Sequence, residues 1–146
     1  MLGIGVSRRA RRNLERGSAA VEFALVLPIF CAIVFGTIDY GWYFYQRFTL
    51  TAAVRDGLRT GVTISQSTAS PGDCSTVART RAAADMVQAG LTAATISNFS
   101  TTTGSSFPTK TMTLTGTYTF TPLVNFVPLP AHGMTYSMTM MFELQQ

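Results

Sequence analysis

One apolar stretch constrains this chain more than any other feature. No charged residue occurs from Phe23 to Ile38, and one acid stands at each end of the run, Glu22 before it and Asp39 after it. A bilayer core needs about 20 mostly apolar residues in a helix, and the range 21–45 supplies this length if Asp39 is tolerated within it. We therefore expect one membrane-spanning helix around which the rest of the chain is organised.

The excess positive charge lies entirely on one side of this run. Residues 1–17 carry five arginines against one glutamate, which accounts for the net charge of +4, while residues 18–146 carry six basic and six acidic groups. Arginines beside a transmembrane segment mark the cytoplasmic side. We thus expect residues 1–17 to be a cytoplasmic leader and the chain from about residue 47 onward to lie outside. Because the folded part is neutral, it lacks the basic footprint of nucleic-acid binding, and we expect no nucleic-acid partner. The leader arginines are Arg8, Arg9, Arg11, Arg12 and Arg16.

A secretory signal peptide is the first alternative for the N-terminal segment. Such a peptide has an apolar stretch of ~7–15 residues followed by a small-x-small cleavage site. Here the apolar stretch is longer, begins with Glu22 and is followed by the bulky sequence TIDYGWYFYQ. These features disfavour ordinary signal-peptide cleavage.

The helical pattern continues well beyond the apolar run. Ser18 is a suitable N-cap, and apolar residues recur at spacings of three and four from Leu50 to Gly61, as on one face of an amphipathic helix. We expect a single helix over residues 18–61, roughly 65 Å long at 1.5 Å per residue. Because a bilayer requires only about half of this length, the outer half of the helix has to pack on a soluble part of the chain.

Three local features modify the expected helix. Pro28 removes one helical donor and frees the carbonyl of Ala24, so a kink is expected there. Gly57 and Gly61 have the small-xxx-small spacing of close helix contacts, but the pattern is common and lies beyond the membrane, so we give it little weight. Aromatic residues gather at the outer end of the run, as in the belts of membrane–water interfaces. They are Tyr40, Trp42, Tyr43 and Tyr45.

The remainder of the chain predicts a small α+β domain. Residues 65–74 and 97–107 have the composition of loops, and a short helix is expected over about 76–89. Over 109–121, threonine at the odd positions alternates with mainly apolar residues at the even ones, and over 134–144 the even positions are again apolar. Such alternation is typical of half-buried strands. Two strands alone are marginally stable, so they should lie on the outer part of the long helix, with room for a third strand.

The expected fold class is therefore α+β. It consists of a long N-terminal helix, first transmembrane and then amphipathic, and a small outer domain with one short helix and an antiparallel strand pair or small sheet. The segment between the strands, PLVNFVPLPAHG, is too apolar for a free loop, so we expect it to pack back on the domain or on a partner. The expected organisation is a leader over 1–17, a helix over 18–61 that spans the membrane over about 21–45, and an extracytoplasmic domain over 62–146.

The junction between leader and helix carries a specific pattern. A basic leader ends in Gly17, the small residue Ser18 follows, and Glu22 is the fifth residue after the break. This arrangement resembles the class III prepilin signature of type IV pilins and pseudopilins. The segment RGSAAVEFALVLPIF is similar to the TadE-like minor pseudopilins of the tight-adherence (Tad) pilus. The resemblance covers about 35 residues, and the alternating strand pair near Glu143 supports it more weakly.

The resemblance implies a maturation step and a role for Glu22. A prepilin peptidase would cut after Gly17 on the cytoplasmic side, the mature chain would begin at Ser18, and the whole +4 excess would be removed. Glu22 would then meet the N-terminal amine of an adjacent subunit and set the axial register, with Pro28 as part of the same assembly segment. The alternative for Glu22 is an acid near a helix N-terminus, where the helix dipole favours it.

The resemblance also implies function, partners and location. The chain would be a minor pseudopilin of a Tad (type IVc) system that takes part in pilus biogenesis or initiation, adhesion and biofilm formation. Its partners would be the prepilin peptidase, other minor pseudopilins and the major pilin, the inner-membrane platform proteins and the lipid bilayer. It would span the bacterial inner membrane once, with the N-terminus cytoplasmic and the C-terminus periplasmic or extracellular, or enter the pilus. The alternative is an uncleaved single-pass protein whose outer domain is a binding module.

No catalytic constellation accompanies these features. His132 is the only histidine, and the sequence has no base paired with a serine or cysteine and no metal-spaced cluster. We expect neither an enzyme nor a bound metal or cofactor.

The remaining chemistry-bearing residues have open interpretations. We treat Asp39 and Trp42 as candidate interface residues: Asp39 would face headgroups or water, or else contact Arg47 or a partner subunit. Cys31 in the apolar run cannot meet Cys74, so no disulfide is expected between them. Cys74 would be a leftover thiol, which permits an intermolecular bridge.

Overall fold

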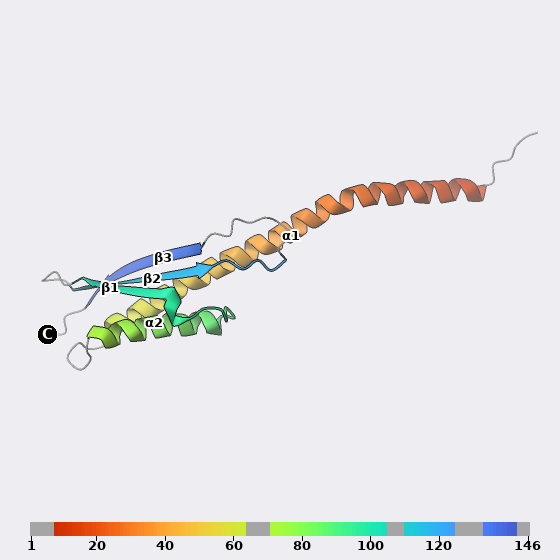
Figure 1. Ribbon diagram of the computed structural model, residues 1–146. Coiled ribbons are helices and arrows are strands. Elements are labelled where there is room, and N and C mark those ends of the chain that lie inside the picture. Colours follow the sequence, from red (N-terminus) through yellow and green to blue (C-terminus); the bar gives the residue numbers. More distant parts are fainter. Residues whose placement is uncertain (1–7, 64–70, 105–109, 125–132, 143–146) are drawn as a thin grey trace, which may run out of the picture.

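A long helix carries a small folded unit on its C-terminal half (Figure 1). This computed structural model describes residues 8–63, 71–104, 110–124 and 133–142. The combination of a long apolar helix, a second helix and a three-stranded antiparallel sheet confirms the α+β class expected from the sequence. In chain order the elements are α1 (Arg8–Thr63), α2 (Pro71–Gln88), a 3-10 turn η1 (Ile96–Asn98), β1 (Phe99–Gly104), β2 (Thr111–Thr119) and β3 (Gly133–Met141).

Helix α1 is longer than the sequence pattern indicates. It has 56 residues, or roughly 84 Å, and begins at Arg8 instead of near Ser18. Pro28 lies inside it, and Figure 1 shows α1 changing direction within its N-terminal half, as expected for a helix that loses a donor. The hydroxyl of Thr37 donates to the carbonyl of Ile33 (2.8 Å), so this polar group is satisfied within the helix itself.

Glycines allow α1 and α2 to cross at very short range. A Cβ at Gly57 would lie 2.5 Å from the carbonyl oxygen of Ala78 and 2.8 Å from the Cβ of Ala82. A Cβ at Gly61 would lie 2.8 Å from the Cβ of Ala78. The small-xxx-small spacing, to which the sequence analysis gave little weight, therefore marks the main helix–helix contact of the outer domain.

The sheet covers the helix pair with one face and presents threonine on the other. Its order is β1-β2-β3, and both pairings are antiparallel. On the outer face the Thr113 and Thr139 hydroxyls are 2.7 Å apart, and those of Thr115 and Ser137 are 3.0 Å apart. The inward residues of β2 and its continuation are buried: Met112, Leu114, Gly116, Tyr118 and Phe120. The alternation read from the sequence is thus confirmed for β2.

The third strand lies where the sequence analysis predicted a loop. Residues 97–107 were expected to be irregular, but Phe99–Gly104 pairs with β2 along its whole length. Only Phe99 of this strand is buried; the polar residues that follow it are largely exposed. An edge strand with so little apolar alternation lacks the signal by which strands are recognised, although its threonines favour extended backbone.

The core lies between the sheet and the outer half of α1. Gly116 allows a close approach, because a Cβ there would lie 2.9 Å from atoms of Leu50, Val54 and Phe99. The other fully buried large side chains come from α1, α2 and β2, and include Leu58, Met86, Met112 and Leu114. The outer half of α1 therefore serves as the central element of the domain, as its length implies.

Candidate membrane anchor and helix clasp

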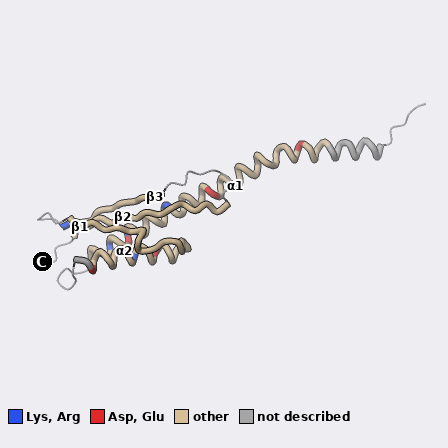
Figure 2. Tube along the Cα trace, viewed as in Figure 1, with Lys and Arg blue, Asp and Glu red and all other residues tan. Residues whose placement is uncertain are grey.

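The N-terminal half of α1 stands free of the folded unit (Figure 1). Large apolar side chains on it are exposed, among them Val21, Phe23, Leu25 and Phe30. Beyond the N-terminal turns that Figure 2 draws in grey, Glu22 is the one charged residue before Asp39. By length and composition α1 is the one helix in the described part of the chain that could cross a membrane. A helix that is apolar on every side fits a lipid environment.

Glu22 is exposed on this free-standing helix. Its Oε1 accepts a 3.5 Å hydrogen bond from the hydroxyl of Ser18, one helical turn earlier. The helix continues through Gly17 and Ser18 without a break. A carboxylate in apolar surroundings is costly unless it is paired, and a single long bond from a serine leaves most of its acceptor capacity unused.

Asp39 has a different environment from the one expected. Its side chain is fully buried (0% exposed), and Oδ1 accepts hydrogen bonds from the backbone N–H groups of Leu123 (3.2 Å) and Val124 (3.0 Å). The expectation that it faces headgroups or water, or pairs with Arg47, is corrected by these contacts. Two backbone donors replace water at Oδ1, and such charge-assisted bonds are strong. The other oxygen, Oδ2, is buried and has no hydrogen-bond partner among the described residues.

Two further residues of α1 hold the same segment. Trp42 Nε1 donates to the carbonyl oxygen of Thr121 (3.1 Å), and Gln46 Nε2 donates to the same oxygen (3.2 Å). We call Asp39, Trp42 and Gln46, together with residues 121–124, the helix clasp. The three α1 residues are three and four positions apart, so they share one face of the helix. This spacing of polar groups was visible in the sequence, but the segment that they bind was not.

The clasp confirms one expectation about the segment between the strands. Residues 121–124 pack back on α1, as its apolar composition implies, whereas 125–132 lie outside the described residues. The aromatic belt also takes part in folding. Trp42 stacks on Tyr45 with a centroid distance of 5.2 Å, and the Tyr45 hydroxyl donates to the carbonyl of Ala89 (2.8 Å).

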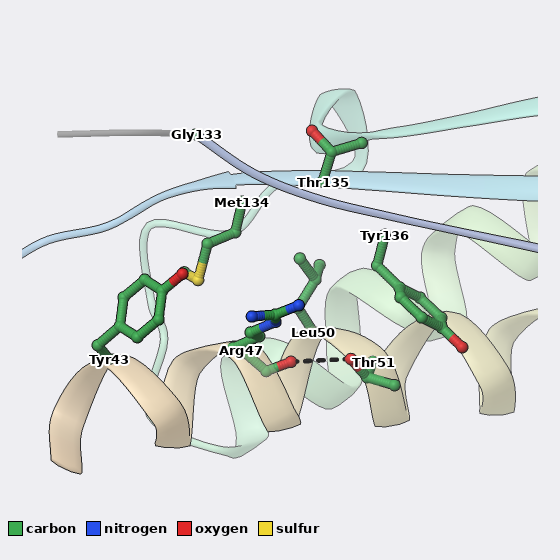
Figure 3. Close-up of a pocket in the computed structure, with 8 residues that line it drawn as sticks. All are labelled: Tyr43, Arg47, Leu50, Thr51, Gly133, Met134, Thr135 and Tyr136. Atoms are coloured by element: carbon green, nitrogen blue, oxygen red, sulfur yellow. Dashed lines mark hydrogen bonds between the residues drawn. The ribbon is translucent and has the colours of Figure 1, made fainter. Parts of the chain in front are cut away.

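A small cavity of about 210 Å³ lies between α1 and the start of β3 (Figure 3). Arg47 extends into it between Tyr43 and Tyr136, and the Thr51 hydroxyl donates to the Arg47 carbonyl (3.0 Å). The remaining lining residues are Leu50, Gly133, Met134 and Thr135. No nucleophile with an adjacent base is among the lining residues.

Within the described ranges no three His, Cys, Asp or Glu side chains come together as metal ligands would. His132 lies outside those ranges.

An ion network joins the two helices on the outer surface. Arg81 Nε lies 2.8 Å from Asp56 Oδ2 and 3.3 Å from Asp85 Oδ1. The hydrogen bond from Arg81, followed by that from Asp85, lowers the pKa of Asp56 below its ordinary value. Burial, followed by the hydrogen bond with Asp56, raises the pKa of Asp85. These shifts belong to a structural contact between α1 and α2 that lies far from the anchor.

The two cysteines and the leader arginines, which the sequence analysis also singled out, all lie in helices. Cys31 and Cys74 are free thiols, and Cys74 is buried in α2 with 3% exposure, so an intermolecular bridge at this position would require the domain to open. The leader arginines from Arg8 to Arg16 lie within the first turns of α1.

Taken together, the fold and the anchor define a class: a single-pass, membrane-anchored protein whose transmembrane helix continues as the spine of a small α+β domain. A family model described as TadE-like protein matches residues 17–59. The match begins at Gly17 and includes the anchor and the three clasp residues of α1, so the resemblance to the TadE-like proteins of the Tad pilus system is confirmed over this segment. No curated protein and no solved structure matches the chain.

The family match bears on the general function. It supports association with the Tad pilus and with other components of that system. The TadE-like family is not known for an enzymatic activity.

Proposed function

We propose that this protein is a minor pseudopilin of a Tad pilus system, matured by a prepilin peptidase and engaged in pilus biogenesis or initiation, and through the pilus in adhesion and biofilm formation. The observation that carries the proposal is the TadE-like match, which starts at the proposed cleavage residue Gly17. A free-standing apolar helix joined to a compact outer domain agrees with a subunit that is first anchored in a membrane and is then incorporated into an assembly.

Maturation between Gly17 and Ser18 would change how firmly the helix is held. The leader contains all of the excess positive charge, and arginines at the cytoplasmic interface resist movement into the bilayer. Once residues 1–17 are removed, the remaining chain has no net charge. Cleavage therefore converts an anchored precursor into a subunit whose helix can leave the membrane axially.

The first experiment tests cleavage at Gly17. Gly17→Trp should leave the leader attached, because a peptidase subsite shaped for glycine has no room for a large side chain. Gly5→Trp, in the same leader, is the matched control and should be processed normally. N-terminal sequencing of the purified protein decides the outcome: Ser18 as the first residue of Gly17→Trp would refute the proposal, as would Met1 in the unsubstituted chain.

Glu22 would set the register of the subunit in the assembly. It is exposed, and the partner that the structure gives it is the weak contact from Ser18. After cleavage, the amine of Ser18 in a neighbouring subunit is a cation of the right size to pair with it. Buried ion pairs of this kind fix geometry more than they add stability. Pro28, in the same free-standing half, would shape how neighbouring helices pack.

The second experiment separates register from cleavage. Glu22→Gln should lower the number of assembled pili at least tenfold while N-terminal sequencing still finds Ser18. Glu15→Gln, which alters a leader residue removed on maturation, is the matched control and should assemble normally. Counting pili by electron microscopy gives the readout, and normal piliation of Glu22→Gln would contradict the register role.

A further inference from the structure

Two exposed apolar residues lie next to the buried acid of the helix clasp. Leu123 is 63% exposed and Val124 is 40% exposed, although both directly follow the region where β2 passes along α1. Their backbone N–H groups are held by Asp39 Oδ1 at 3.2 and 3.0 Å. The side chains are therefore fixed in an exposed position while their backbone is fixed to the helix.

This position coincides with the outer end of the apolar run. The uncharged residues from Phe23 to Ile38 extend over roughly 24 Å as helix, close to the ~30 Å hydrocarbon thickness of a bilayer. Asp39 is the next residue, so the backbone of Leu123 and Val124 is tied to α1 at the end of the uncharged run, in the outer part of the 21–45 span expected from the sequence. Ile38 and Tyr40, on either side of Asp39, are also exposed.

We propose that Leu123 and Val124 insert into the outer leaflet at the membrane interface, and that Asp39 is the positioning residue which holds them there. The occupant of this surface is lipid. The proposal rests on the assignment of the apolar run to the bilayer. The outer domain would then contact the membrane at two places, through α1 and through the turn after β2, and could not swing freely about the helix.

The size and chemistry of the surface favour lipid over a protein partner. Two side chains are far below the ~800 Å² that each partner contributes to a standard protein interface, but they suffice as an added contact for a domain that is already anchored. Position also argues for lipid, because Asp39, which holds this surface, is flanked along α1 by the exposed residues Ile38 and Tyr40. The same geometry explains the buried acid: residues 121–124 cover Asp39 and present apolar side chains where the carboxylate would otherwise meet lipid.

The test places a fluorescent probe at the proposed contact. In full-length chain carrying Cys31→Ala and Cys74→Ala, Leu123→Cys is labelled with a nitrobenzoxadiazole maleimide and reconstituted in phosphatidylcholine–phosphatidylglycerol vesicles. Thr102→Cys is the control, because it is exposed on β1 and pairs with Thr113 toward the opposite end of β2 from residues 121–124. The probe at 123 should be quenched by doxyl-labelled lipid at least three times as strongly as the probe at 102, and should resist aqueous iodide.

Each outcome bears on the proposal. Equal quenching at 123 and 102 by both agents would overturn it. Protection from iodide without quenching by doxyl lipid would mean that protein, such as a second copy of the chain, covers the surface, and this would also overturn it. The purified chain is used without peptidase or pilus components, so failure of the proposed maturation would leave this result unchanged.

The role of Asp39 is tested in the same assay. Asp39→Ala removes the acceptor and should lower doxyl-lipid quenching at 123 to the level at 102, whereas Asp39→Asn keeps an oxygen at this position and should retain most of the signal. Unchanged quenching in Asp39→Ala, with the near-ultraviolet circular dichroism of a folded domain, would refute the positioning role. If Asp39→Ala does not fold, Asp39→Asn alone carries the test. A folded Asp39→Asn variant in which doxyl-lipid quenching at 123 falls to the level at 102 would then refute the positioning role.

Discussion

A single carboxylate oxygen, Asp39 Oδ1, ties two distant parts of the chain together at the C-terminal end of the uncharged run. The contact joins residues more than eighty positions apart and is reinforced by Trp42 and Gln46, which both donate to the Thr121 carbonyl. Unpaired polar groups in such a site each cost about 1–3 kcal/mol. Oδ1 and the two backbone N–H groups avoid this cost by pairing, whereas the buried Oδ2 has no hydrogen-bond partner among the described residues. The clasp therefore restricts the end of β2 to one position along α1.

At the same scale, the pKa shifts of the ion network predict an acid-dependent stability. Because the pKa of Asp56 is lower in the folded state, its ionised carboxylate stabilises the fold at pH values above the pKa of the unfolded chain. This stabilisation is lost as the pH falls through the pKa of the folded state. The raised pKa of Asp85 has the opposite sign: its ionisation costs stability at neutral pH, and the cost disappears when it is protonated.

Asp85→Asn should therefore raise the free energy of unfolding at pH 7 by up to about 1 kcal/mol, since the partly exposed network limits the effect. The gain should shrink toward zero below about pH 4, where Asp85 of the unsubstituted chain is protonated. Asp56→Asn is the matched control and should lower stability at pH 7. Denaturant unfolding of the full chain in detergent at several pH values measures both. A gain for Asp85→Asn that is the same at pH 3 and pH 7 would contradict this assignment.

How much of the candidate site the sequence could predict depends on where each partner lies. Glu22, Gly17 and Pro28 belong to one contiguous pattern, so a local motif was enough to single them out. Asp39 could be recognised as unusual, but its partners are backbone N–H groups of Leu123 and Val124. Backbone donors have no sequence signature, and for this reason the burial of Asp39 could not be foreseen.

At the scale of elements, the α1–α2 crossing depends on two glycines, Gly57 and Gly61, whose lack of a side chain lets the helices approach closely. Gly57 faces the carbonyl oxygen of Ala78, a backbone atom that cannot turn aside as a side chain can. Ala78, Ala82 and Met86 of α2 are fully buried against this contact. The Arg81–Asp56 pair closes the outer edge of the same crossing.

Gly57→Ala should destabilise the outer domain by about 1–3 kcal/mol, because the added methyl group overpacks the crossing, even though alanine favours helix over glycine by up to about 1 kcal/mol. Gly41→Ala is the matched control: the space around Gly41 is open within 4 Å, so the same substitution there should be neutral or stabilising. Thermal unfolding followed by circular dichroism compares the two variants. Equal melting temperatures would show that the helices do not depend on this close approach.

The elements themselves differ in how far their sequences reveal them. Strand β2 was predicted because its inward apolar positions alternate with threonine, whereas β1 was predicted as a loop because only Phe99 of its residues enters the core. The start of α1 was placed too late because the basic residues before Gly17 have good helix propensity but no apolar pattern. A pattern-based prediction finds elements that bury a face and misses those that do not.

At the scale of the whole molecule, the basic leader and the folded domain lie at opposite ends of the long helix α1. All excess positive charge lies within residues 1–17, before the apolar run, and the folded domain lies at the other end of α1 (Figure 1). A neutral domain gives no electrostatic preference for either side of a membrane, so the leader arginines alone should determine the orientation in which α1 inserts.

Replacing Arg8, Arg9, Arg11 and Arg12 by glutamine should therefore reduce the fraction of molecules whose C-terminus lies outside. Arg55→Gln combined with Arg59→Gln, which removes positive charge from the outer half of α1, is the control and should leave orientation unchanged. A C-terminal alkaline phosphatase fusion, active only outside the cytoplasm, reports the fraction in cells. The leader substitutions should lower phosphatase activity per molecule several-fold; full activity would mean that the apolar helix or the outer domain sets orientation without the arginines.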